Sequence, residues 1–234
     1  MTKDDFYNSI IISDDDRARA DRFIESKGLV KHVLIKKKLE NWTSEKIKYT
    51  EISSTYRYDK RIRQVLFKYI SYLEEFYRAV ILDNYIDNTQ QDFWDNNLNR
   101  LLGVCGNDLN RALEQLDFKT LLKQVRVLPE SIRSKCGLPP KHIARNTFAL
   151  KELRNAVMHN QFLLLSRNFA KCYVVGVDAD MSANLKANIL NLINFLPSGP
   201  KEQCVIDINN CKVDRNTDSD TKWELPPQIA INIS

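Results

Sequence analysis

The apolar positions of the chain recur with a helical period over its longest uninterrupted stretch. Between Asp59 and Tyr85, apolar side chains fall mostly three or four residues apart, and no Gly or Pro interrupts them. This spacing places one apolar stripe along a helix of about 3.6 residues per turn. The same pattern predicts further helices over residues 14–27, 31–42, 92–102, 109–126, 141–165 and 182–196, the last with Ser182 as its N-cap.

The scarcity of turn residues supports an all-α fold. The chain contains six Gly and seven Pro among 234 residues, about half the usual combined share of roughly 12%. β-Sandwiches, barrels and glycine-rich nucleotide-binding folds need more turn residues or glycine loops, so we expect an all-α protein. The composition becomes polar after Cys211, which predicts a polar C-terminal tail over residues 213–234.

The sequence predicts neither a membrane span nor a secretion signal. No uncharged apolar run approaches the roughly 20 residues that cross a bilayer, and residues 1–5 lack the basic-then-apolar pattern of a signal peptide. Five cysteines are scattered without a C-x-x-C pair, and neither His32 nor His142 has a Cys or His at ligand spacing. We therefore expect a cytoplasmic protein with reduced cysteines, no metal and no cofactor.

Positive charge is concentrated in one segment. Residues 31–65 contain ten Lys or Arg against four Asp or Glu, and Trp42, Tyr49, Tyr56 and Tyr58 lie among them. Cations that meet phosphates and rings that stack on bases favour an RNA-binding surface, although a solvated helical face has a similar composition. The candidate RNA-binding residues are Lys36, Lys37, Lys38, Arg57, Lys60, Arg61 and Arg63.

The candidate catalytic residues lie in the second half of the predicted 141–165 helix. At about 100° per residue, Glu152, Asn155 and His159 form one polar row, in which the amide can orient the imidazole. Arg154 lies about 140° around the helix and about 7.5 Å along it from His159. The predicted buried stripe of this helix consists of Leu150, Leu153, Ala156, Val157, Asn160 and Leu164.

These side chains suit the cleavage of RNA without a metal. A histidine can move a proton to or from the 2′-hydroxyl or the leaving 5′-oxygen, an arginine can stabilise the added negative charge, and an asparagine can hold the ring or the phosphate. On one helix, however, Arg154 and His159 do not easily share a phosphate. A two-fold dimer that packs this helix against its copy would bring the arginine of one chain towards the histidine of the other.

Two stretches resemble a known family. Residues 154–159, Arg-Asn-Ala-Val-Met-His, resemble the R-N-x-x-x-H motif of HEPN-domain ribonucleases, and they lie near the end of a long helix as in that family. The earlier helix, with Tyr56, Asp59, Glu74 and Arg78, is similar to the "Y-x-x-D … I-E-x-x-x-R" helix of the Abi-like (AbiD/AbiF) abortive-infection group. The resemblance covers roughly residues 50–196.

The resemblance implies an HEPN-type helical bundle over residues 51–198, with an N-terminal helical extension over 1–50 and a C-terminal segment and tail over 199–234. It implies a homodimer with metal-independent endoribonuclease activity. It also implies a phage-defence or toxin-type effector that a bound non-coding RNA could restrain. The residues implied in catalysis are Arg154, Asn155 and His159, and those in support are Glu74, Arg78 and Glu152.

Two alternatives stay open at this stage. The chain could be a non-catalytic RNA-binding HEPN module within a ribonucleoprotein, or a helical protein-interaction domain with no RNA role. The presence of Arg, Asn and His together favours the nuclease over the first alternative. The basic segment favours either RNA-related function over the second.

Overall fold

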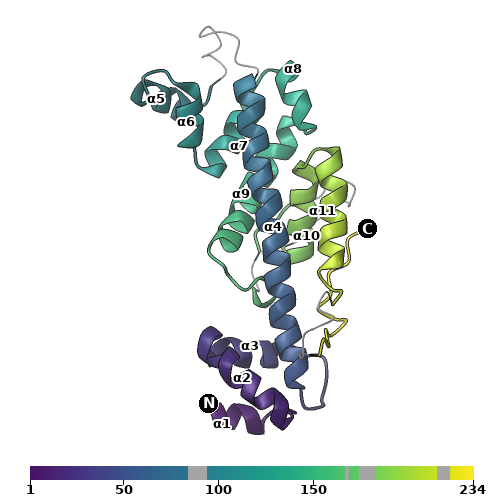
Figure 1. Ribbon diagram of the computed structural model, residues 1–234. Helices are drawn as coiled ribbons and strands as arrows, with labels where there is room; N and C mark the ends of the chain where they lie inside the picture. Colours follow the sequence, from purple (N-terminus) through teal and green to yellow (C-terminus); the bar gives the residue numbers. More distant parts are fainter. Residues whose placement is uncertain (84–93, 167–168, 174–182, 215–221) are drawn as a thin grey trace. The chain divides into compact units, whose positions relative to one another are not determined.

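The computed structural model of the protein describes residues 1–83, 94–166, 169–173, 183–214 and 222–234 (Figure 1). These residues form an all-α protein, as predicted, and Ile11 and Lys48 form an isolated parallel bridge. None of the helices in these ranges is long and apolar enough to cross a membrane. The elements are α1 (Lys3–Asn8), α2 (Asp14–Lys27), α3 (Leu29–Leu39), α4 (Tyr49–Asp83), α5 (Asn96–Val104), α6 (Leu109–Glu114), α7 (Phe118–Val127), α8 (Glu130–Arg133), η2 (Ser134–Cys136), α9 (Pro140–Met158), η3 (Leu163–Leu165), α10 (Leu185–Phe195) and α11 (Ser198–Asn210).

The chain divides into two compact units. The first unit contains residues 1–64, 162–166 and 207–234, and the second contains residues 65–161 and 167–206. The sequence placed the first 50 residues in an extension of their own. In the structure these residues instead group with the first part of α4 and with the C-terminal segment.

Local capping explains the N-terminal helices of the first unit. The Asp5 N–H donates to the Thr2 hydroxyl at 3.2 Å and the Thr2 N–H donates to the Asp5 carboxylate at 2.8 Å, a reciprocal capping box that starts α1. The Ser13 hydroxyl caps α2 by accepting from the Asp16 N–H at 3.2 Å. This helix ends at Gly28, whose φ of 86° suits glycine, and its predicted bounds are confirmed.

The longest helix, α4, begins at Tyr49 rather than at the predicted Asp59. Several buried positions in its first turns are polar, and Asp59 itself is buried together with Ser54 and Thr55. A hydrophobic pattern counts polar residues as exposed, so the buried stripe could be recognised only from Ile62 onwards. The predicted end of this helix lies outside the described residues.

The C-terminal residues 222–234 are not the polar tail that the sequence predicted. The Ile231 N–H donates to the Tyr58 hydroxyl at 2.8 Å, and the Asn209 side-chain amide exchanges hydrogen bonds of 2.7 and 3.0 Å with the backbone of Ile233. The side chains that this segment buries in the first unit are Ile229, Ile231 and Ile233. Burial of alternate residues is typical of extended backbone, whereas the prediction searched for a helical period.

One other predicted helix is divided in the structure, and one helix, α11, was not predicted. The helix expected over 109–126 is divided into α6 and α7, because the Asp117 carboxylate accepts from the Thr120 N–H at 3.0 Å and starts a new helix. The sequence Pro-Ser-Gly-Pro at 197–200 ends α10 and also begins α11. Pro200 is tolerated there because the first turn of a helix does not need its N–H groups.

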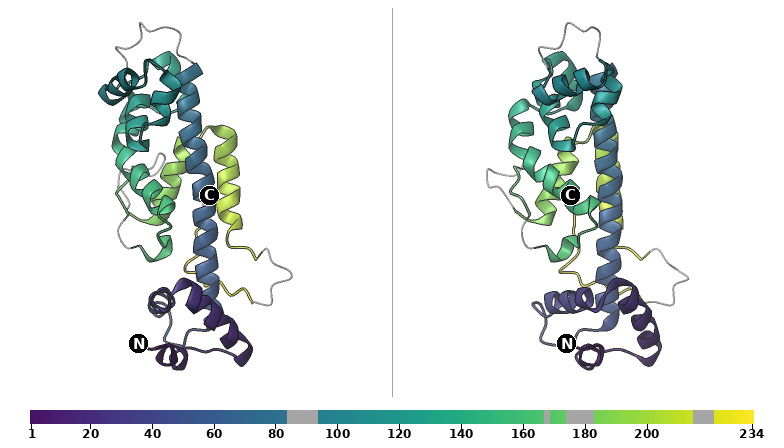
Figure 2. Two further views of the ribbon diagram at one scale, coloured as in Figure 1. Left: turned by 60° about the vertical axis from the view of Figure 1, so that its left-hand side comes forward. Right: turned by 90° about the vertical axis from the view of Figure 1, so that its left-hand side faces the viewer.

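In the second unit, α9 packs on α7 and on α10. Both views of Figure 2 show α10 beside α9. The Asn184 side chain caps α10 by accepting from the Ala187 N–H at 2.8 Å, whereas the predicted cap Ser182 lies outside the described residues. Small buried side chains, Ala149, Cys172 and Ala187, form a cluster in this unit.

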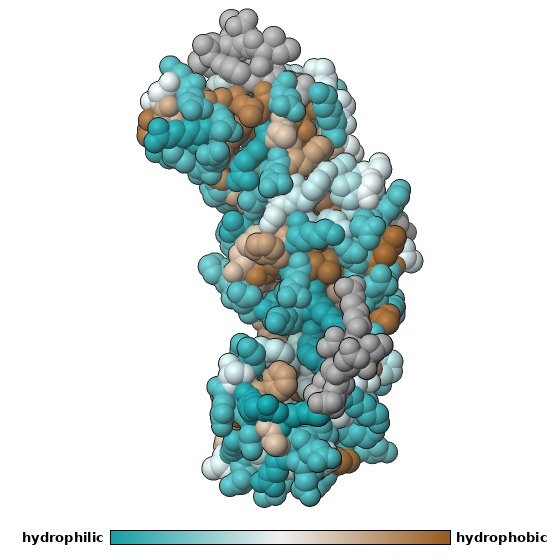
Figure 3. Space-filling model, in the orientation of Figure 1, coloured by the Kyte–Doolittle hydropathy of each residue, from teal (hydrophilic) through white to brown (hydrophobic). Residues whose placement is uncertain are grey.

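The remaining apolar surface is distributed in patches. All five cysteines are buried. On the face that Figure 3 shows, hydrophobic residues form separate patches within a mostly hydrophilic surface. Trp42 and Phe148 are among the large apolar side chains that stay exposed, at 42% and 58%, and such side chains mark candidate contact surfaces.

Two buried histidines predict a loss of stability in mild acid. The His32 Nδ1 lies 3.0 Å from the Gly28 carbonyl oxygen, and the His142 Nε2 lies 3.1 Å from the Asn146 amide nitrogen. Burial lowers the pKa of both imidazoles, and the charge of Arg145 adds to the effect at His142. The unfolded chain therefore binds protons that the folded chain does not, and the free energy of unfolding falls as pH decreases below about 6.5.

Urea unfolding between about pH 7 and pH 5 measures this loss, which can reach about 1.4 kcal/mol per pH unit for each histidine. A His142→Gln variant should show a shallower dependence, because one of the two titrating groups is removed. Equal slopes for the variant and the unmodified protein would contradict the assignment.

Candidate functional site

α9 carries the Arg-Asn-His residues in its last turns and ends immediately before His159, which is its C-cap. Asn160 follows with a left-handed φ of 52°. The Asn160 N–H donates to the Val157 carbonyl at 3.1 Å and the Gln161 N–H donates to the Ala156 carbonyl at 2.9 Å, which is the Schellman pattern of helix ends. The predicted continuation of this helix is therefore wrong, and Asn160 is exposed rather than buried. The signal was present in the sequence, because asparagine is second to glycine at this position.

The exposed face of α9 presents Phe148, Glu152, Asn155 and His159 at helical spacing. Phe148 and His159 are exposed, and the other two side chains are half-buried. Glu152 forms an ion pair of 3.1 Å with Lys151. Within the part of the chain that the structure describes, the side chains of Asn155 and His159 form no hydrogen bond or ion pair, with each other or with other residues. Both are therefore accessible to another molecule.

Arg154 leaves α9 in a different direction and meets α4 in the second unit. Its Nε donates to the Glu74 Oε1 at 3.2 Å, and only 33% and 14% of the two side chains is exposed. Among the described residues, the terminal nitrogens Nη1 and Nη2 of Arg154 have no partner. The ion pair thus fixes the guanidinium through Nε and leaves its two terminal nitrogens available to an anion.

The same carboxylate holds a second arginine. The Glu74 Oε2 accepts from the Arg78 Nη1 at 3.4 Å, while Arg78 donates through Nε to the Leu113 carbonyl at 3.1 Å and through Nη2 to the Leu116 carbonyl at 3.4 Å. These carbonyls lie at the C-terminal end of α6, where the helix dipole favours a cation. The structure therefore brings Glu74, Arg78 and Arg154 together, whereas Glu152 lies on the exposed face of α9.

The backbone that follows the motif is held within the first unit by Asp59. The Leu164 N–H in η3 donates to the Asp59 Oδ1 at 3.0 Å, and the Arg63 Nε donates to the Asp59 Oδ2 at 2.7 Å. Burial raises the pKa of the Asp59 carboxyl group, and the hydrogen bond from Leu164 and the charge of Arg63 oppose this rise. Asp59 of the Y-x-x-D pattern therefore has a structural contact that the sequence did not predict.

Several predicted RNA-binding residues form contacts within the first unit instead. The guanidinium groups of Arg57 and Arg61 lie 5.0 and 4.5 Å from the centre of the Trp223 ring. Arg63 and Lys36 form ion pairs within their own helices, and Lys36 is buried. These four side chains thus have contacts within the chain that the sequence did not predict, and their contact with RNA stays a prediction. The predicted residues that stay exposed or half-buried without such contacts to acidic groups are Lys37, Lys38 and Lys60.

Neither a metal-binding cluster among the described residues nor a known relative assigns a function to the site. Within the described residues, no group of three or more His, Cys, Asp or Glu is placed to hold a metal ion. Comparison with family profiles, with curated proteins and with solved structures finds no match to this chain. The structure therefore defines an all-α protein with an Arg-Asn-His set at the C-terminal end of α9.

The Glu74–Arg154 ion pair predicts an energetic coupling between α4 and α9. In a double-mutant cycle of Glu74→Ala and Arg154→Ala, we expect a coupling energy of about 1 kcal/mol, because the pair is largely shielded from water. Urea unfolding of the four proteins measures it. The matched control combines Glu152→Ala with Arg154→Ala, whose effects should add because these side chains form no ion pair. Additive effects of the Glu74 and Arg154 changes would show that the contact is not formed.

Proposed function

We propose that the protein is a metal-independent endoribonuclease of the HEPN type that acts as a homodimer. One observation carries the proposal: Glu74 orients Arg154 through its Nε, while Asn155 and His159 stay accessible at the end of α9. An oriented guanidinium can stabilise the charge of the transition state and an accessible imidazole can transfer protons, so the two groups suit phosphoryl transfer without a metal. The resemblance of residues 154–159 to the HEPN motif supports RNA as the substrate.

In the proposed reaction the ribose 2′-oxygen attacks the neighbouring phosphorus, and the bond from phosphorus to the 5′-oxygen breaks. One product ends in a 2′,3′-cyclic phosphate and the other begins with a 5′-hydroxyl. His159 accepts the proton of the 2′-hydroxyl, and the leaving 5′-oxygen receives a proton from this imidazole or from water. The terminal nitrogens of Arg154 bind the phosphate oxygens as their negative charge increases. Asn155 positions the imidazole or the phosphate.

A homodimer would complete this site. Arg154 contacts α4, whereas His159 is exposed at the C-cap of α9, so one chain presents the two groups in different directions. Phe148 is 58% exposed on the same face of α9 as Asn155 and His159. An exposed aromatic side chain beside the motif supports packing of this face against a second copy, which would bring the arginine of one chain near the histidine of the other.

The proposed biological role follows the Abi-like resemblance. A nuclease that cleaves cellular RNA would stop growth of an infected cell, which is the action of a phage-defence or toxin-type effector. A bound non-coding RNA would restrain it until infection. Expression of the protein should therefore slow growth, and the His159→Ala form should not.

One observation favours a second function, RNA binding without cleavage. Glu74 neutralises part of the positive charge of Arg154 within the chain, and this reduces what the guanidinium can contribute to a transition state. The chain would then be an RNA-binding module of a ribonucleoprotein. Salt-sensitive RNA binding with no cleavage would identify this function. A helical protein-interaction domain, in contrast, should not bind RNA even at low salt.

His159→Ala should abolish RNA cleavage. Single-stranded and structured RNA is incubated with the purified protein in EDTA, and the ends of the products are mapped. The unmodified protein should leave 2′,3′-cyclic phosphate ends, and the variant should be slower by about a hundredfold or more, because loss of a general acid or base typically costs that much. Lys141→Ala, at an exposed position in the first turn of α9, is the control and should cleave normally. Cleavage that survives His159→Ala would sink the proposed mechanism.

Mixed dimers of inactive chains should regain activity. In a dimer of one Arg154→Ala chain and one His159→Ala chain, one composite site loses both groups and the other keeps both. Random mixing places about half of the molecules in such dimers, so we expect about a quarter of the unmodified activity. Differently tagged chains allow the mixed dimer to be isolated. An inactive mixed dimer of confirmed composition would show that the site is not shared between chains.

A further inference from the structure

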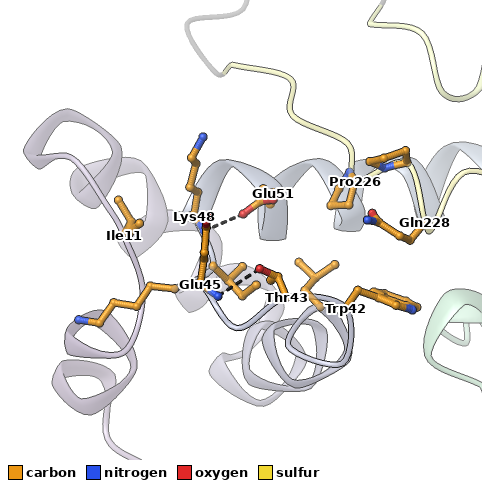
Figure 4. Close-up of a pocket in the computed structure, with 12 residues that line it drawn as sticks. Ile11, Trp42, Thr43, Glu45, Lys48, Glu51, Pro226 and Gln228 are labelled. Carbon is orange, nitrogen blue, oxygen red and sulfur yellow. Dashed lines mark hydrogen bonds between the residues drawn. The ribbon is translucent and has the colours of Figure 1, made fainter.

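A pocket of about 350 Å³ lies in the first unit, and the proposed nuclease reaction does not use it. Four segments form it: Ile11 between α1 and α2, the end of α3 with the loop that follows it, the first turn of α4, and the C-terminal residues 226–228 (Figure 4). Its volume falls in the range of small-molecule sites, roughly 300–1,000 Å³. The apolar part of its wall consists of Ile11, Leu39, Ile47, Pro226 and Pro227.

Trp42 supplies an exposed aromatic surface to this pocket. The ring is 42% exposed, and the Trp42 N–H donates to the Leu39 carbonyl at 3.0 Å, which fixes the backbone at the end of α3. Trp42 and Gln228 both line the pocket, and Figure 4 shows Gln228 above Trp42, on segments that are far apart in the sequence. Gln228 is exposed, and its side-chain amide offers both a donor and an acceptor. The pocket thus combines a flat ring with a hydrogen-bonding edge.

The segment that forms one wall of the pocket carries a positive excess, whereas the pocket lining itself is balanced, with Lys46 and Lys48 against Glu45 and Glu51. Residues 31–48 contain six Lys against two Glu. The Lys38 Nζ lies 5.7 Å from the centre of the Trp42 ring. Lys46 and Lys48 line the pocket and are exposed, and the Lys48 Nζ lies 3.6 Å from the Glu224 carboxylate. Of the acidic residues that line it, Glu51 accepts a hydrogen bond from the Lys48 N–H at 2.8 Å and so belongs to the start of α4, whereas Glu45 lies on the exposed loop.

We propose that this pocket binds an unpaired base of single-stranded RNA. The base stacks on Trp42, its edge meets the amide of Gln228, and the neighbouring phosphates meet the lysines of residues 37–48. A ring together with cations is the combination that holds single-stranded nucleic acid, and unpaired bases are the part of RNA that proteins recognise by stacking and hydrogen bonds. The identification of the ligand as RNA rests on the proposed function, but the pocket requires binding only and no cleavage. It would hold the RNA at a position separate from the Arg-Asn-His residues.

The test measures binding under conditions that exclude cleavage. The full chain carries His159→Ala in every sample, and binding of fluorescein-labelled single-stranded RNA of about ten nucleotides is followed by anisotropy. Trp42→Ala and Trp42→Phe are compared with Phe67→Ala, which removes another exposed aromatic side chain that does not line the pocket. A second probe, an oligonucleotide of the same length without bases, reports contacts to the backbone alone. Thermal unfolding of each variant shows that it is folded.

Trp42→Ala should weaken binding of the RNA between about five- and a hundredfold. Trp42→Phe should keep most of the affinity, and Phe67→Ala should keep all of it. The oligonucleotide without bases should bind with the same affinity to the Trp42→Ala chain and to the chain that keeps Trp42. Lys46→Ala should reduce the salt dependence of binding by a slope of about 0.7, whereas Trp42→Ala should leave the slope unchanged.

Three outcomes would overturn the inference: unchanged RNA affinity in Trp42→Ala, an equal loss for the oligonucleotide without bases, or no binding of any oligonucleotide at low salt. These outcomes are distinct from failure of the nuclease. If RNA binding depends on Trp42 but the chain with an unmodified His159 does not cleave RNA, the base-binding pocket is supported and the proposed nuclease reaction is contradicted. If a Trp42→Ala chain with His159 intact cleaves RNA with an unchanged KM, the nuclease reaction is supported and the base-binding pocket is contradicted.

Discussion

The fold depends on α4 remaining one uninterrupted helix from Tyr49 to Asp83. No Gly or Pro occurs in it, and it supplies one shielded carboxylate to each unit, Asp59 to the first and Glu74 to the second. Each carboxylate binds a segment that is distant in sequence: Asp59 accepts from the Leu164 N–H, and Glu74 accepts from Arg154. Both contacts are made by side chains whose direction is set by the helix. The chain is therefore held before and after the imidazole of the motif by residues of a single element.

Those parts of the fold that are encoded by neighbouring residues could be predicted from the sequence. α2 was predicted with its bounds because the acidic residues of its first turn and Gly28 are local start and stop signals. The start of α4 was missed because Asp59 and its neighbours are polar and buried, and a pattern of hydrophobic residues cannot show that a polar side chain has a partner elsewhere. The C-terminal segment was missed for a similar reason, since its alternating isoleucines pack on distant elements of the first unit.

The sequence predicted which residues belong to the candidate site better than it predicted the contacts between them. The motif itself identified Arg154 and His159, and the family resemblance singled out Glu74 as a supporting residue. Glu74 and Arg154 are 80 residues apart in the sequence, so their contact belongs to the tertiary structure and is not visible in the sequence pattern. The charge count of the basic segment could not show that the guanidinium of Arg61 lies over Trp223, because composition does not reveal such contacts. Net charge describes a surface only after the internal partners of each cation are known.

In the proposed nuclease, the position of the motif at a helix C-terminus gives a reason for the arginines beside it. The last carbonyls of α9 form the negative end of its dipole, which disfavours a bound phosphate. Glu74 adds a negative charge, but Arg78 and Arg154 more than offset it, and the three side chains together carry one positive charge. An apolar replacement of a shielded ion pair is often neutral or stabilising, so stability alone does not account for Glu74. Its contact with the Nε of Arg154 instead gives the guanidinium one direction, and in the proposed reaction the electrostatic contribution of Arg154 to a phosphate depends on that direction being held before the substrate arrives.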